Sequence, residues 1–194
     1  RPSCAREYAV GAFQTAIDIW RTQINSPVPI VVDAQYQSLG STLLGLAGFR
    51  NVFSNFPGAP LANVFYPVPI ANKLSGVDRD VEKADISITL NSSANWSYAI
   101  DGVPVAGKPD FVSAVLHELG HGLGFAGSAS INSITGLGQI GLMGRPYVFD
   151  TNAADSANTG IVDASVYPAG SVALANLIKG TGVAGPGLFW KGAN

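Results

Sequence analysis

The chain has 194 residues, of which 47% are apolar and 12% charged, and its formal net charge is −2. This length and apolar content argue for a sizeable core and against disorder, and the lack of a basic run argues against nucleic-acid or polybasic membrane-surface binding. No apolar run approaches the roughly 20 residues needed to span a bilayer.

The first half of the chain predicts a helix followed by strands. Residues 6–24 carry apolar side chains at helical spacing, and residues 28–36 form a β-branched run bounded by proline, typical of a buried strand. Residues 36–48 are small and glycine-punctuated and predict no element. Residues 62–76 predict an edge strand or loop and then a short helix. The alternation in residues 84–93 predicts a half-buried strand.

Residues 95–110 read as a turn and hairpin, with Asp101-Gly102 as the turn. Asp110 then stands as an N-cap before the helix-forming segment FVSAVLHELGHGLGF, residues 111–125. The chain beyond Gly127 is rich in loops.

A helix over residues 171–180 interrupts the loop-rich second part. The order of elements predicts an α+β fold in one catalytic domain covering residues 1–194. We expect an N-terminal subdomain, residues 1–124, of helices and a twisted mixed sheet that ends in the active-site helix. Residues 125–194 are then a loop-rich and incomplete C-terminal subdomain.

The segment HELGHGLGF, residues 117–125, holds both histidines of the chain. On a helix, a spacing of four places His117 and His121 on one face, where both can bind one metal ion. Glu118 lies beside that face, where it can take a proton from a metal-bound water and pass it to a leaving amine. The pattern predicts that His117 and His121 bind Zn²⁺ and that Glu118 is catalytic.

The glycines of this segment have separate candidate roles. Gly124 stands where a left-handed residue would end the helix. Gly120 and Gly122 cost helix propensity, and two explanations remain open: close packing of another segment, or an open cleft.

The same nine residues fit the pattern H-E-x-x-H-x-x-G, and the chain therefore resembles the metzincin zinc peptidases. Phe125 makes it most similar to leishmanolysin and its secreted bacterial relatives, over residues 6–125 and more loosely over 126–194. The resemblance implies a metzincin-like fold and a zinc-dependent endopeptidase acting on proteins or peptides. It also implies an edge strand beside the cleft, which we expect at residues 85–90, where an extended substrate could add as another strand.

A third zinc ligand is harder to place. Many metzincins supply it three residues after the motif glycine, where this chain has Gly127, and no histidine follows His121. Asp150 is the candidate within the chain, although an ordinary turn or cap aspartate is the favoured role. We expect instead a histidine from a C-terminal continuation, because the leishmanolysin-like pattern places that ligand late. Met143 has two interpretations, a methionine turn or a packing residue, and packing is favoured.

Two classes of function follow. The first is a secreted zinc endopeptidase, and the alternative is a binding or assembly module that keeps the peptidase fold without a competent site. Low charge and many glycines and prolines favour an extracellular protein, and the first residue, Arg1, suggests a mature or trimmed product. Cys4 predicts a buried thiol or half of a bridge to another chain. Aspartates in residues 152–163 could suggest calcium, but their spacing matches no known loop.

Overall fold

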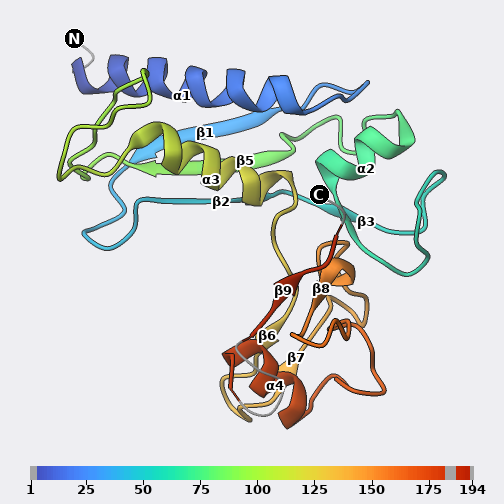
Figure 1. Ribbon diagram of the computed structural model, residues 1–194. Helices are drawn as coiled ribbons and strands as arrows, with labels where there is room; N and C mark the ends of the chain where they lie inside the picture. Colours follow the sequence, from blue (N-terminus) through green and yellow to red (C-terminus); the bar gives the residue numbers. More distant parts are fainter. Residues whose placement is uncertain (1–3, 182–186, 193–194) are drawn as a thin grey trace. The chain divides into compact units, whose positions relative to one another are not determined.

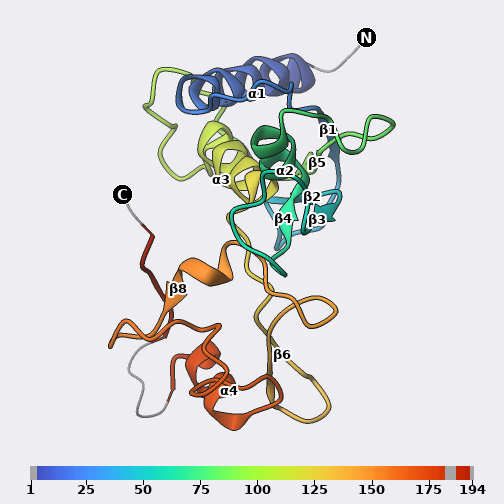
Figure 2. The ribbon, with the colours of Figure 1, turned by 90° about the vertical axis from the view of Figure 1, so that its right-hand side faces the viewer.

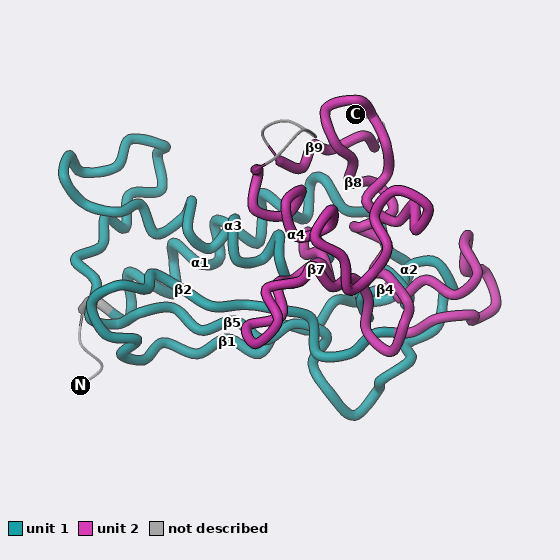
Figure 3. The backbone as a smooth tube through the Cα atoms, turned by 90° about the horizontal axis from the view of Figure 1, so that it is seen from below, with its two compact units in different colours: residues 1–52, 67–124 teal, residues 53–66, 125–194 magenta. Residues whose placement is uncertain are grey.

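The computed structural model describes residues 4–181 and 187–192, which divide into two compact units. Unit 1 comprises residues 1–52 and 67–124, and unit 2 comprises residues 53–66 and 125–194 (Figure 3). Four helices and several short sheets make this an α+β protein, as the sequence predicted. The segment 53–66, which precedes the histidine helix in sequence, groups with the later part of the chain.

Unit 1 contains three helices and a three-stranded sheet (Figure 1). Its elements are α1 (Cys4–Gln23), β1 (Val32–Gln37), β2 (Gly45–Phe49), α2 (Val68–Ser75), β5 (Ile86–Asn91) and α3 (Phe111–Leu123). The short strands β3 (Val52–Phe53) and β4 (Tyr66–Pro67) form a separate two-stranded sheet, and each spans a point where the chain passes from one unit to the other.

The sheet of unit 1 is mixed, with strand order β1-β5-β2. β1 runs parallel to β5, whereas β2 runs antiparallel to it. The segment predicted as a substrate-binding edge is therefore the central strand, and that prediction is wrong. The alternation of β5 itself is confirmed, because Ile86, Ile88 and Leu90 are buried while Ser87 and Thr89 are partly exposed.

Helices α1 and α3 lie on the same side of this sheet (Figure 2). Small or apolar side chains of α3 face the sheet, and alanines at helical spacing on α1 let that helix pack closely on α3. The buried core that results comprises Ala9, Ala12, Ala16, Ile88, Leu90, Trp96, Phe111, Val112, Val115 and Leu119. This core fixes α3, and with it the histidine motif, against the sheet.

One segment left without a prediction forms a strand, and one local prediction failed. β2 begins inside residues 36–48, for which no element was predicted, and ends just after them. Its glycines weaken the strand signal in the sequence, and its pairing with β5 stabilises the strand instead. Residues 95–110 form turns and no hairpin strands. The Asp101-Gly102 turn is present, with Gly102 at φ 80 and the Asp101 carboxylate accepting a hydrogen bond from the Val103 backbone N–H at 3.0 Å.

Unit 2 is built mainly from loops, as the sequence predicted for residues 125–194. Its elements are β6 (Ser130–Ile131), β7 (Gly138–Gln139), the 3-10 helix η1 (Asp150–Asn152), β8 (Ala153–Ala154), α4 (Val172–Lys179) and β9 (Phe189–Trp190). α4 begins after Ser171, whose hydroxyl accepts a hydrogen bond from the Leu174 N–H, and it ends at Gly180 in the left-handed conformation. A small core gathers around this helix, comprising Ala153, Ile161, Tyr167, Leu174 and Leu177.

In the described ranges, no helix is both long and apolar enough to cross a membrane. This agrees with the expectation from the sequence. The Cys4 side chain is not among those that the structure describes, so the prediction of a buried or bridged thiol lies outside the described residues.

Candidate functional site

Helix α3 carries the histidine motif and is capped at both ends. Asp110 has extended backbone angles, and its carboxylate accepts a hydrogen bond from the Ser113 backbone N–H at 2.9 Å. Gly124 adopts a left-handed conformation at φ 118, and its N–H bonds to the carbonyls of Gly120 and His121. Both caps were predicted. They bound the helix at Phe111 and Leu123, so it ends soon after His121.

The two histidines meet on one face of α3. Their Nε2 atoms lie 3.0 Å apart, and the rings are nearly perpendicular, at 89°. Two imidazole nitrogens on a tetrahedral zinc, each about 2.0–2.1 Å from it, are separated by about 3.3 Å. A small side-chain movement therefore converts the observed pair into two zinc ligands. The same separation also suits a hydrogen bond between a protonated and an unprotonated ring nitrogen.

Glu118 lies between α3 and the edge strand β2. A Cβ atom at Gly45 would stand 2.9 Å from the Glu118 Cγ and 3.2 Å from its Oε1, so only glycine leaves this space free. Gly45 thus places the carboxyl group of Glu118 against the beginning of β2. No local sequence signal marks Gly45, because its role depends on a contact between two elements that are distant in sequence.

The glycines inside the helix serve different purposes. A Cβ atom at Gly122 would stand 2.3 Å from the Ile86 Cγ2, far inside van der Waals contact, so α3 packs on β5 through a bare backbone. At Gly120 a Cβ atom would meet only the Trp20 ring, at an ordinary 3.8 Å. Close packing is therefore the explanation at Gly122 but is not required at Gly120.

Asp150 holds together a loop of unit 2. Its side chain is buried, with 1% of the residue exposed, and it accepts hydrogen bonds from the backbone N–H groups of Ser128 at 2.9 Å and Tyr147 at 2.7 Å. The Ser128 hydroxyl donates to the same carboxylate. A Cβ atom at Gly127 would stand 2.7 Å from the Asp150 Oδ1. The position where the metzincin pattern places a ligand thus makes room for a structural aspartate.

Other aspartates of unit 2 also have local partners. Asp155 accepts hydrogen bonds from the Ala157 and Thr159 backbone N–H groups and from the Tyr167 hydroxyl at 2.7 Å. The bond from Tyr167 is the main cause that lowers the pKa of Asp155, and the same bond, with burial, raises the pKa of Tyr167 to about 12. These contacts account for Asp155 as a turn-forming residue rather than a calcium ligand.

Met143 was expected to pack, and that prediction is wrong. The residue is 89% exposed and has a left-handed backbone at φ 51. It lies in a tight turn in which Leu142 and Arg145 exchange backbone hydrogen bonds. The turn geometry, rather than a core contact, explains the position of this side chain.

Comparison with known proteins gives one match. A family model described as SPBPB7E8-like matches residues 62–140, less than half of the chain, and this range includes the histidine motif. No curated protein and no solved structure matches the chain.

The expected membership of the metzincins is therefore wrong. The matching family is a different one, and within the described ranges no group of three or more His, Cys, Asp or Glu side chains could hold a metal ion. The metzincin resemblance rested chiefly on residues 117–125 and on the order of the elements before them, and these leave the rest of the fold open.

Proposed function

We propose that the chain is a zinc-dependent endopeptidase in which His117 and His121 bind the metal and Glu118 is the general base and acid. The observation that carries this proposal is the approach of the two Nε2 atoms to 3.0 Å on one face of α3, where Glu118 directly follows His117 in the chain. Within the described ranges the chain supplies two of the three protein ligands usual in a catalytic zinc site. The residues outside those ranges hold no His, Cys, Asp or Glu, so the proposal takes the third ligand from outside these 194 residues.

Zinc, when bound, supplies a Lewis acid that polarises a peptide carbonyl and makes water a better nucleophile. The residues of the chain position this chemistry and move the proton. Glu118 accepts a proton from the attacking water and delivers it to the nitrogen of the leaving amine. Gly45 supports this role because it leaves the carboxyl group room beside the sheet edge.

A peptide substrate has a binding surface available at β2. This strand pairs with β5 on one side, and in the described sheet its other side is an edge. An extended peptide could add there through backbone hydrogen bonds, next to the Glu118 carboxyl group. The substrate-binding edge that we first expected in β5 is thus proposed for β2.

A second candidate function is a binding or assembly module that does not hydrolyse peptides. The observation that favours it is the lack of a three-ligand group among the residues that the structure describes. In this reading, the Nε2–Nε2 approach is a hydrogen bond between the two imidazoles. For either function we propose an extracellular location, because only 12% of the residues are charged.

The two functions are separated by Glu118→Gln, with zinc content and hydrolysis of an unfolded protein substrate measured on the same sample. A peptidase loses at least about a hundredfold in kcat while it keeps its zinc, because the variant removes the proton acceptor and leaves the ligands. The exposed Glu82→Gln is the matched control and should leave both quantities unchanged. Hydrolysis that is equal in Glu118→Gln and wild type would exclude the peptidase.

A further inference from the structure

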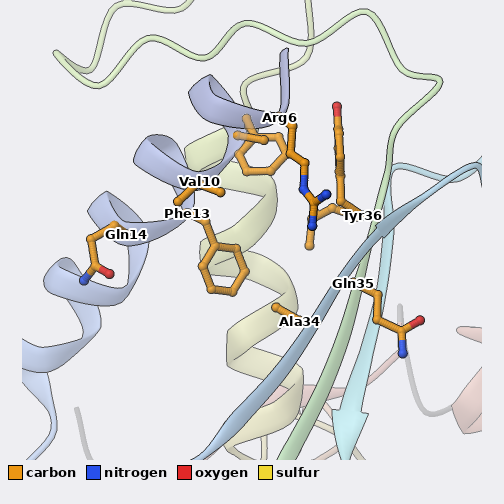
Figure 4. Close-up of a pocket in the computed structure, with 10 residues that line it drawn as sticks. Arg6, Val10, Phe13, Gln14, Ala34, Gln35 and Tyr36 are labelled. Carbon is orange, nitrogen blue, oxygen red and sulfur yellow. The ribbon is translucent and has the colours of Figure 1, made fainter. Parts of the chain in front are cut away.

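A pocket of about 220 Å³ lies in unit 1 between the N-terminal half of α1 and strand β1 (Figure 4). It is lined by residues of α1, β1 and β5 and by Phe111 at the start of α3. None of its lining residues belongs to the segment 117–125. The pocket is therefore separate from the candidate metal site.

The inner part of the pocket is apolar. Ala9, Leu90 and Phe111 are buried core residues that reach its floor, and Phe13 forms a wall from α1. Ala34 of β1 also faces it and is itself exposed, since its methyl group borders open space. A ligand that enters this space must present a hydrocarbon surface, because a polar group here would lose its hydration without a partner.

The rim of the pocket carries a positive charge. The Arg6 side chain extends from α1 across the opening toward Tyr36 (Figure 4). No ion pair with Arg6 is found among residues 4–181 and 187–192. The Tyr36 hydroxyl is already engaged with the Tyr98 hydroxyl at 2.7 Å, which holds the Tyr36 ring as a fixed wall. The charge at this rim is therefore available to an anion.

We infer that this pocket binds a medium-chain aliphatic carboxylate, with the chain against Ala9, Phe13 and Phe111 and the carboxylate on Arg6. The planar guanidinium matches a carboxylate with two parallel hydrogen bonds, which gives the charged end its fixed place. An apolar cavity of about 150 Å³ binds benzene, so a volume of 220 Å³ suits a chain of roughly six to eight carbons. A longer chain would extend into solvent.

The probe for this site is octanoate, titrated into the purified protein by calorimetry at neutral pH. Saturable binding to one site per chain is expected, and Arg6→Gln should weaken it by about tenfold, because a charge-assisted hydrogen-bonded pair is lost. Octanol, which has the same chain without the charge, should bind wild type at least about tenfold more weakly than octanoate. Ala34→Leu, at an exposed position, fills the pocket and should abolish binding without unfolding the protein.

Two controls locate the binding. Arg21→Gln removes an exposed cation near the other end of α1 and should leave octanoate affinity unchanged. His117→Ala should also leave it unchanged, which separates this pocket from carboxylate binding to a metal. The inference is overturned by a lack of saturable octanoate binding, by equal affinity in wild type and Arg6→Gln, or by loss of binding in His117→Ala.

Discussion

The substitution Gly122→Ala tests how helix α3 is held against the sheet. The new methyl carbon would stand 2.3 Å from the Ile86 Cγ2 and 3.0 Å from its Cδ1, whereas carbon atoms pack best at about 3.5–4.0 Å. Ile86 is 1% exposed on a strand paired on both sides, so neither element can easily retreat. Overpacking of this kind costs up to about 3 kcal/mol, and the gain in helix propensity returns about 1 kcal/mol. The free energy of unfolding should therefore fall by about 2 kcal/mol in urea denaturation.

Gly120→Ala, two residues earlier on the same helix, is the matched control. Its methyl group meets only the Trp20 ring, at 3.8 Å, so the propensity gain should appear as a stabilisation of up to about 1 kcal/mol. In an Ile86→Ala background, which removes the clashing atoms, Gly122→Ala should no longer destabilise the protein. Equal stability of the two alanine variants, or a penalty that persists in the Ile86→Ala background, would refute this packing.

Three further predictions follow from the side-chain contacts. Tyr167 should ionise near pH 12, because its hydroxyl donates a hydrogen bond to the Asp155 carboxylate. This bond stabilises the fold below about pH 10, and the stabilisation is lost as the pH rises through about 12. Ultraviolet titration of wild type against Tyr167→Phe checks this, and a tyrosine that ionises near pH 10 in the difference between the two curves would contradict it. Asp150→Ala should lower the free energy of unfolding by roughly 3 kcal/mol, because it leaves buried N–H groups unpaired, and an unchanged urea midpoint would argue against that role. Gly45→Ala should displace Glu118 and lower kcat by about tenfold at constant zinc content, and an unchanged kcat would remove Gly45 from the positioning of the base.

The parts of the fold that the sequence predicted are those with local signals. Helix α3 follows from apolar spacing, from Asp110 as a cap and from Gly124 as a stop, all within fifteen residues. The alternation of buried and partly exposed residues in β5 likewise follows from the pattern of neighbouring residues in the sequence. These features depend on backbone geometry and on side chains one turn apart, so periodicity is sufficient to find them.

The parts that failed depend on contacts between distant segments. The central place of β5 is set by its pairing with both β1 and β2, which no local pattern encodes. The family expectation failed for a related reason, since a helix motif predicts roles for Glu118 and the two histidines but not the third ligand or the surrounding fold. The close approach of Gly45 to Glu118 could not be predicted from the sequence for the same reason.

Zinc titration tests the central claim most directly. Metal-free protein is titrated with zinc at neutral pH by calorimetry, in parallel with His117→Ala and His121→Ala. We predict one zinc per wild-type chain and a zinc affinity at least about a hundredfold lower in each variant. Removing only the hydrogen-bond partner of a metal-binding histidine already lowers metal affinity by up to about a hundredfold. A wild-type chain that binds no zinc, or binding that survives both substitutions unchanged, would contradict the account.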